Sequence, residues 1–201
     1  TFFDRWYRHL NNKYKEPEAL TVDMVVDFKQ RLKGEIKKRG LLYHAVGHGW
    51  TCEPFGLPGL GWDPKEYPVD DEIRPYLAEV NGQRGIWHGI PLNTQLCFSN
   101  AEARKAVVDY AVEYVQENDR IDVLHVWLAD SANNHCECAD CRGTLPADFY
   151  VQLLNEMDAA FARHDIDIKI AFVVYLDLLW PPQTEQFNNP DRFVLLFAPI
   201  S

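Results

Sequence analysis

The densest group of reactive side chains is the segment from Cys136 to Cys141, which places three cysteines in the pattern Cys-x-Cys-x-x-Cys. Three thiolates this close together suit tetrahedral Zn²⁺, although structural zinc sites usually combine two separated pairs of ligands. Either the adjacent His135 or Cys97, at the end of an expected strand, could supply a fourth ligand. Free thiols or one disulfide are the alternatives, because five cysteines cannot all pair within one chain. We expect no cofactor for catalysis and keep a structural zinc ion as one interpretation of this loop.

Two aspartates follow expected strands and are the candidate catalytic groups. Asp130 closes an apolar segment beside Trp127, where partial loss of solvent would raise its pKa towards that of a general acid. Asp177 follows the next strand and could be the second carboxylate of a glycosidase pair. The alternatives are a turn or helix cap at Asp130 and a solvated loop residue at Asp177.

Two histidines lie near the carboxyl end of the first expected strand. His44 and His48 are four positions apart, but not on a helix, so they lack the geometry of a helical zinc site and suit sugar hydroxyls better. Gly47 and Gly49 would let the backbone approach a ligand, and Trp50 could stack on a sugar ring. Packing in a core is the alternative role for either histidine.

Further aromatic residues lie in the same loops. We assign Trp127, Tyr175 and Trp180 to substrate binding because each stands at or just after the end of a strand. Trp62 and Trp87 lie in a long Gly- and Pro-rich segment and could be ring platforms or lids over the site. Each of these side chains could instead serve in packing.

Helices and strands alternate around these residues. Apolar periodicity and capping residues predict three helices, over 21–39, 99–117 and 146–164. Ser99 and Glu102 form a capping box at the start of the second helix. A helical stretch is also expected within 70–80. Short apolar or alternating runs predict strands at 41–46, 95–98, 121–128, 166–174 and 193–197.

This alternation predicts an α/β fold with parallel strands and outer helices, either a doubly wound sheet or a (β/α) barrel. We expect one domain over residues 1–201. A full eight-stranded barrel needs about 250 residues, so the expected fold is a partial (β/α)8 TIM barrel of about five parallel strands. Its candidate residues would lie at the carboxyl ends of the strands, the face that carries sites in such folds.

The composition of the chain limits the classes of partner that it is expected to bind. The net charge is -10, and the longest basic run is Lys37 to Arg39, which argues against nucleic acid. No apolar stretch approaches the roughly 20 residues of a membrane span, and residues 1–10 lack the layout of a signal peptide. We expect a soluble chain without a membrane partner, and the pattern assigns neither compartment nor oligomeric state. No phosphate-binding glycine motif occurs.

Five stretches together resemble the bacterial family known as domain of unknown function 4838, whose members are predicted carbohydrate-active barrels similar in layout to α-glucuronidases and β-hexosaminidases. The stretches are RGLLYHAVGHGW (Arg39–Trp50), NGQR (Asn81–Arg84), QLCFSNAEARKAV (Gln95–Val107), VLHVWLAD (Val123–Asp130) and CECADC (Cys136–Cys141). Their order and spacing carry the resemblance more than any single motif.

The resemblance implies a (β/α)8 barrel in which Asp130 sits where related glycosidases keep a catalytic acid. It assigns no second carboxylate, and the Asp-Glu pair of hexosaminidases is missing at Asp130. The expected function is glycoside hydrolysis of a carbohydrate substrate. The alternatives are a non-catalytic carbohydrate-binding barrel and a metal-dependent hydrolase that uses His44 and His48.

Overall fold

The structure, a computed structural model, describes residues 21–59 and 61–199 and divides the chain into two compact units, Thr1–Tyr43 and His44–Ser201. The first unit contains helix α2 (Val22–Lys38). The hydroxyl of Thr21 accepts a hydrogen bond from the Met24 amide at 3.2 Å, and Gly40 follows the helix with a φ of +65°. The predicted helix over 21–39 and its N-cap are therefore confirmed.

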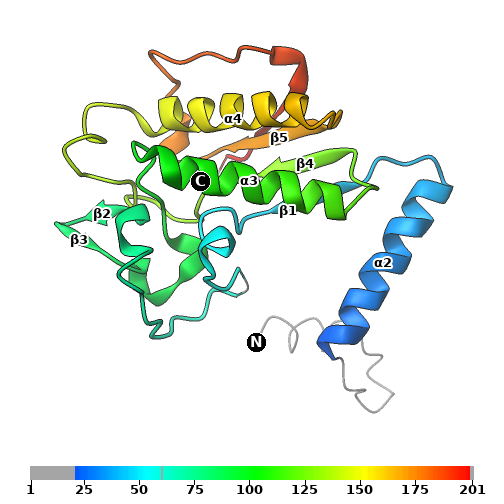
Figure 1. Ribbon diagram of the computed structural model, residues 1–201, viewed down its shortest axis with the longest axis horizontal. Coiled ribbons are helices and arrows are strands. Elements are labelled where there is room, and N and C mark those ends of the chain that lie inside the picture. Colours follow the sequence, from blue (N-terminus) through cyan, green and yellow to red (C-terminus); the bar gives the residue numbers. More distant parts are fainter. Residues whose placement is uncertain (1–20, 60, 200–201) are drawn as a thin grey trace. The chain divides into compact units, whose positions relative to one another are not determined.

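The second unit is built on a parallel sheet of four strands in the order β1-β4-β5-β6 (Figure 1). They are β1 (His44–Gly47), β4 (Val123–Val126), β5 (Lys169–Val174) and β6 (Phe193–Phe197). Each neighbouring pair is parallel. The expectation of an α/β fold with parallel strands is confirmed at this level.

Two helices, α3 (Ala101–Glu117) and α4 (Pro146–Arg163), lie side by side over one face of this sheet (Figure 1). The residues between them and the sheet are apolar and nearly inaccessible, such as Leu124 and Ile170 on the strands, and Phe161 on α4. Burial of this area supplies most of the drive to fold. It also holds β1, β4 and β5 in register, so that their carboxyl ends meet at one edge.

Two sequence predictions about the segments before α3 are wrong. Residues 95–98 are not a strand of the parallel sheet; Leu96 forms an isolated antiparallel bridge with Leu77. Of the helix expected within 70–80, only the 3-10 turn Arg74–Tyr76 forms. Residue 76 is followed by an extended stretch that pairs with 95–97 through backbone hydrogen bonds, and this tertiary pairing overrides the local helical pattern.

The N-cap of α3 also differs from the prediction. Asn100, not Ser99, caps the helix, because its side-chain oxygen accepts hydrogen bonds from the amides of Glu102 and Ala103 at 3.0 and 3.4 Å. The hydroxyl of Ser99 lies instead 3.1 Å from the sulfur of Cys141. Both residues are good caps, and the neighbouring thiols decide between them.

The segment between β1 and α3 is mostly turns, with a two-stranded hairpin formed by β2 (Glu79–Val80) and β3 (Gln83–Arg84). Its two turn residues, Asn81 and Gly82, have φ values of 52° and 72°. Positive φ at both positions is typical of the type I′ turn that matches the twist of a tight hairpin. The hairpin presents Glu79 and Arg84 to the cysteine loop.

A buried carboxylate stabilises the loop after β5. Asp148, on α4, is 2% exposed and accepts hydrogen bonds from the backbone amides of Gln183, Thr184 and Glu185 at 2.9, 2.8 and 2.9 Å. Burial raises the pKa of this carboxyl, but the hydrogen bonds from the amides outweigh burial, and the net effect lowers the pKa. Asp148 is therefore a structural acid.

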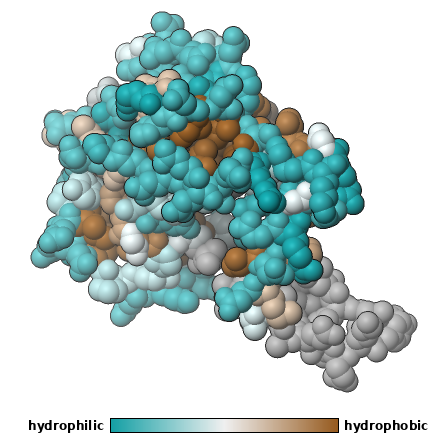
Figure 2. Space-filling model, turned by 45° about the vertical axis from the view of Figure 1, so that its right-hand side comes forward, coloured by the Kyte–Doolittle hydropathy of each residue, from teal (hydrophilic) through white to brown (hydrophobic). Residues whose placement is uncertain are grey.

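The face of the molecule drawn in Figure 2 is mainly hydrophilic, with local apolar patches. Strand β6 carries large exposed apolar side chains, among them Leu195 at 58% and Phe197 at 59% exposure. No helix among the described residues has the length and apolar character to cross a membrane.

Candidate functional site

Three polar side chains meet where neighbouring parallel strands end. His48 directly follows β1, Tyr175 directly follows β5, and Asp130 lies four residues beyond the end of β4, the strand between them. The phenol of Tyr175 donates a hydrogen bond to Oδ1 of Asp130 at 3.1 Å, and Nε2 of His48 lies 3.9 Å from the same oxygen. The strand order places these side chains, which are distant in sequence, around one carboxylate.

The hydrogen bonding of His48 determines what its ring presents to Asp130. Nδ1 of His48 lies 2.7 Å from the carbonyl oxygen of Leu128. A carbonyl only accepts, so Nδ1 carries a hydrogen and donates. A neutral ring then directs the lone pair of Nε2 towards Asp130, whereas a protonated ring directs an N–H. The ring nitrogen that faces Asp130 is therefore an acceptor in neutral His48 and a donor in protonated His48.

Tyr175 is a fixed donor in this group. Its side chain is largely enclosed, and burial, together with the negative charge of Asp130, raises the pKa of the phenol well above its ordinary value. The phenol therefore keeps its proton across the physiological pH range. Its hydrogen bond goes to Oδ1 of Asp130, the oxygen nearest to His48 among the contacts of this group.

Aromatic rings surround His48. Trp127 lies edge-on with its ring centroid 5.2 Å away, and Trp62 approaches at 6.4 Å in a similar orientation. Trp62 is 45% exposed, so a ligand could reach part of this residue. The indole nitrogen of Trp127 is buried and has no hydrogen-bond partner among the described residues. Polar and aromatic groups thus occur together, as they do in many small-molecule sites.

The loop between β1 and α3 holds the backbone around Asp130. The amide of Asp130 donates to the carbonyl of Leu92 at 2.9 Å, and the indole of Trp87 donates to the Ser131 hydroxyl at 3.3 Å. The side-chain amide of Asn134 donates to the carbonyl of Asn93 at 2.7 Å. Trp87, a predicted platform or lid, therefore anchors the loop beside Asp130.

Three other residues that the sequence singled out lie outside this group. Nδ1 of His44, at the amino end of β1, lies 2.8 Å from Nε2 of His125 on β4. Trp50 is 1% exposed, donates to the carbonyl of His125 and packs against the tyrosines of α3. Trp180 is 72% exposed. Of the predicted sugar contacts, His48 and Tyr175 approach Asp130, and Trp127 packs against His48.

Asp177, the second candidate carboxylate, has different partners. Its Oδ2 accepts a hydrogen bond from the Asn133 amide at 2.6 Å and lies 3.8 Å from Nε2 of His135. Burial lowers the pKa of His135, although the charge of Asp177 opposes this effect. His135, an alternative metal ligand in the sequence analysis, is therefore directed towards Asp177.

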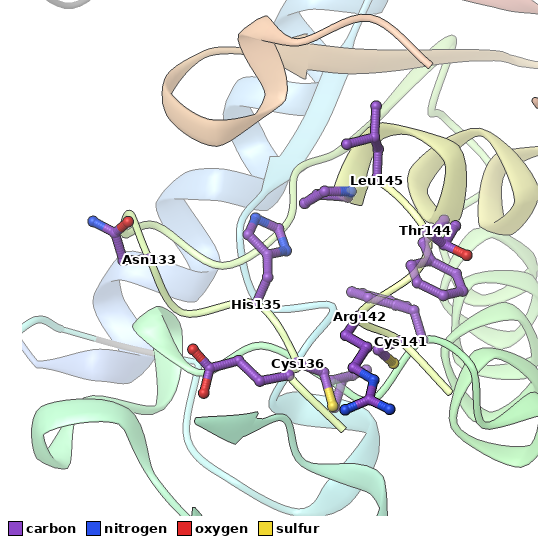
Figure 3. Close-up of a pocket in the computed structure, with 12 residues that line it drawn as sticks. Asn133, His135, Cys136, Cys141, Arg142, Thr144 and Leu145 are labelled. Carbon is purple, nitrogen blue, oxygen red and sulfur yellow. The ribbon is translucent and has the colours of Figure 1, made fainter. Parts of the chain in front are cut away.

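Asn133 and His135 also line a cavity of about 410 Å³ (Figure 3). Leu96, Phe98, Leu145 and Phe149 contribute apolar surface, while Glu137, Arg142 and Thr144 contribute polar groups. Cys136 and Cys141 form part of the same wall. Neither Asp130 nor His48 lines this cavity, so it belongs to the cysteine region of the molecule.

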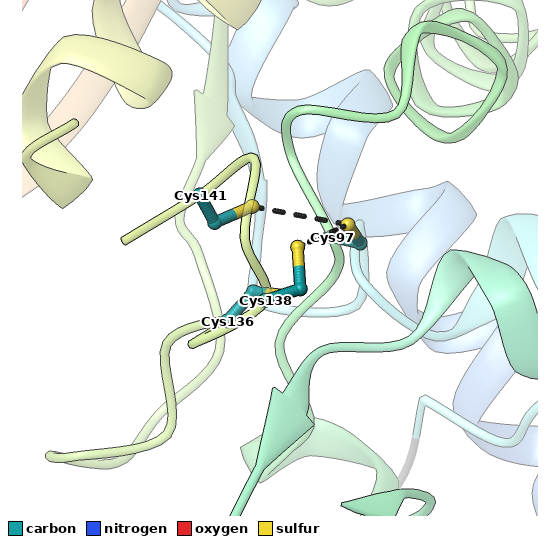
Figure 4. Close-up of side chains that lie close together, drawn as sticks. All are labelled: Cys97, Cys136, Cys138 and Cys141. Atoms are coloured by element: carbon teal, nitrogen blue, oxygen red, sulfur yellow. Dashed lines mark hydrogen bonds between the residues drawn. The ribbon is translucent and has the colours of Figure 1, made fainter. Parts of the chain in front are cut away.

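Four cysteines converge beside the cavity (Figure 4). The sulfurs of Cys97, Cys136, Cys138 and Cys141 all lie within 4.8 Å of one another. Cys97 Sγ is 3.7 Å from Cys138 Sγ and 3.8 Å from Cys141 Sγ. The predicted fourth member at Cys97 thus lies with the other three. They form a candidate metal site, and the described residues contain no comparable group that includes a histidine.

Polar groups surround the four sulfurs. The Glu79 amide donates to Cys136 Sγ at 3.3 Å, and a guanidinium nitrogen of Arg84 lies 4.0 Å from the same sulfur. Hydrogen bonds from the thiols of Cys136 and Cys141 lower the pKa of Cys97, whereas the hydrogen bonds with Cys136 and Cys97 raise the pKa of Cys141. These contacts therefore favour a thiolate at Cys97.

Sequence reasoning missed the partners of these sites. His125, Ser99, Glu79 and Arg84 were not predicted to take part. The stretch NGQR drew attention to the turn before Arg84, but no local pattern relates that turn to the cysteine loop. Such contacts depend on how distant segments fold together.

No protein-family model, curated protein or solved structure matches this chain. The function is therefore argued from the geometry of the site.

Proposed function

We propose that this chain is part of a carbohydrate-active (β/α) barrel that hydrolyses glycosidic bonds, with Asp130 as the general acid. One observation carries the proposal: Asp130, His48 and Tyr175 meet beside aromatic rings at the carboxyl ends of three adjacent parallel strands. Sites in parallel α/β folds occupy this edge. The four parallel strands are consistent with part of such a barrel.

The carboxyl group of Asp130 would supply the proton for the reaction. Glycoside cleavage requires a carboxylic acid that protonates the leaving oxygen. The Leu128 carbonyl keeps the hydrogen of a neutral His48 on Nδ1, so Nε2 of the neutral ring is a hydrogen-bond acceptor on the side of Asp130. The gap of 3.9 Å between Nε2 and Oδ1 of Asp130 is too long for a direct hydrogen bond. A substrate oxygen bound between them would receive the proton.

The sugar itself would lie against Trp62. Its exposed ring next to His48 offers an apolar face for the C–H groups of a pyranose, while His48 and Asp130 offer hydrogen bonds to hydroxyls. Asp177 is the proposed second carboxylate because it follows the adjacent strand β5. The side chain of Asp177 is 30% exposed, so a substrate could reach it. Its carboxylate accepts a hydrogen bond from a backbone amide, which fits the acceptor role of an ionised carboxylate.

The test compares the wild-type full chain with Asp130→Asn on a panel of aryl glycosides and oligosaccharides. Turnover by the variant should fall by about 100-fold or more, the usual contribution of a general acid. Sugar affinity, measured by calorimetry, should change little because Asn preserves shape and hydrogen bonding. Asp119→Asn is the matched control, because its side chain is 91% exposed.

Equal turnover by the wild type and Asp130→Asn would reject the assignment of the acid. A wild-type chain that binds sugars but hydrolyses none of the panel would instead support a carbohydrate-binding role for the same surface.

A further inference from the structure

The four cysteines lie outside the proposed catalytic group and join three segments of the chain. Cys97 precedes α3, the other three lie on the loop between β4 and α4, and the hairpin Glu79–Arg84 contacts this loop. We propose that Cys97, Cys136, Cys138 and Cys141 bind one Zn²⁺ ion as thiolates, and that the ion fastens these three segments together.

The sulfur spacing matches a single tetrahedral ion. With a Zn–S bond of about 2.3 Å, the edge of a regular tetrahedron of sulfurs is about 3.8 Å. Cys97 Sγ lies 3.7 Å from Cys138 Sγ and 3.8 Å from Cys141 Sγ, and no sulfur pair exceeds 4.8 Å. Binding therefore needs only small side-chain adjustments.

The same distances argue against a disulfide and against an iron–sulfur cluster at this site. Bonded disulfide sulfurs are about 2.05 Å apart, and all five cysteines of the chain are free thiols. An iron–sulfur cluster places several metal and sulfide atoms between its thiolates, so the thiolates would have to stand farther apart than one ion requires. Among metals that favour four sulfur ligands, a mononuclear ion of the zinc type fits this space.

The surroundings balance the charge of such a centre. Four thiolates and Zn²⁺ carry a net charge of −2, which needs donors nearby. The Glu79 amide donates to Cys136 Sγ at 3.3 Å, the Arg84 guanidinium lies 4.0 Å from that sulfur, and the Ser99 hydroxyl lies 3.3 Å from Cys97 Sγ. Hydrogen bonds of this kind orient thiolate ligands and strengthen metal binding.

Because cysteines would fill all four positions, the ion has no open position for water or substrate, and its role is structural. Glu137, within the cysteine loop, makes two hydrogen bonds to the hairpin. Its backbone amide donates to the Glu79 carbonyl, and its carboxylate accepts from the Asn81 amide, each at 2.7 Å. Zinc would therefore stabilise the hairpin and the wall of the neighbouring cavity, part of which is Cys136 and Cys141.

The experiment measures metal content by mass spectrometry on the full chain, purified under reducing conditions and reconstituted with ZnCl₂ alone. The expected result is one zinc per chain, and replacement by Co²⁺ should produce the intense absorption of a tetrahedral tetrathiolate. Cys138→Ser should lose stoichiometric zinc. Cys52→Ser is the matched control, because Cys52 is also buried but its thiol donates to the Gly49 carbonyl.

Arg84→Gln provides a second variant that preserves all four ligands. Its zinc affinity, measured by competition with a chelator, should fall about tenfold, as for other groups that orient metal ligands. If Cys138→Ser does not fold, the zinc content and the cobalt spectrum of the wild type still test whether the four cysteines bind one metal ion.

Absence of bound metal in the reconstituted wild type, stoichiometric iron in place of zinc, or full zinc content in Cys138→Ser would each overturn the proposal. These measurements do not involve sugars, so they stand or fall separately from the proposed hydrolase.

Discussion

The cysteine cluster and the Asp130 site are assembled in different ways. Three of the four cysteines lie within one short loop, and only Cys97 comes from elsewhere, 41 positions before Cys138. Asp130, His48 and Tyr175 instead follow three different strands, and Tyr175 is 45 positions beyond Asp130. The loop brings most of the thiols together by covalent connection, whereas the carboxylate site depends wholly on strand order.

This difference predicts separate sources of stability. The Asp130 site is held by the buried sheet and its helices, which need no ion. The cysteine loop has little regular structure, and its segments would depend on the metal for much of their order. The predictions below test this separation.

The largest effect is expected from loss of the proposed zinc. Cys138→Ser should lower the free energy of unfolding by more than about 4 kcal/mol, a magnitude typical of a lost metal site. Denaturant titration of the zinc-loaded proteins measures it, with Cys52→Ser as control. A chelator should reproduce the loss in the wild type and increase amide exchange in the hairpin Glu79–Arg84. An equally stable chelated protein would contradict the separation.

A smaller effect is expected at Asp148, the carboxylate that holds the loop after β5. Asp148→Asn should lower stability by about 2 kcal/mol, because three charge-assisted hydrogen bonds become neutral ones. Asp130→Asn is the comparison, since its side chain is partly exposed, at 36%, and should change stability little.

The pKa of Asp148 is lowered in the folded state. Its contribution to stability is therefore present above the unfolded pKa of about 3.9 and is lost as pH falls through the lower folded pKa. Asp148→Asn should flatten this acid slope. An unchanged slope in the Asp148 variant would show that other carboxyls dominate the acid transition.

The smallest effect is expected from Tyr175→Phe. This change removes the hydrogen bond to Asp130 but keeps the ring, so stability should fall by about 1 kcal/mol. In the proposed hydrolase, turnover should also fall, because Asp130 loses the hydrogen bond that helps to position its carboxyl group. The zinc content should stay the same, and a loss of zinc would link the two regions.

Local sequence patterns were sufficient to predict those elements whose determining residues lie close together in the sequence. The helix from Thr21, the helix from Pro146 and the strand Phe193–Phe197 were predicted because caps, periodicity and an apolar run act within a few residues of one another. They failed at Ser99 and at residues 95–98. There, partners from other parts of the chain compete for the same atoms.

Residue types and spacing alone were thus enough to indicate an α/β fold with parallel strands, a thiol cluster and Asp130 as a candidate acid. The folded chain then selected His48 over His44 as the neighbour of Asp130, and Cys97 over His135 as the neighbour of the other thiols. Contacts across parallel strands depend on strand order and register, which long crossover connections leave open in the linear chain.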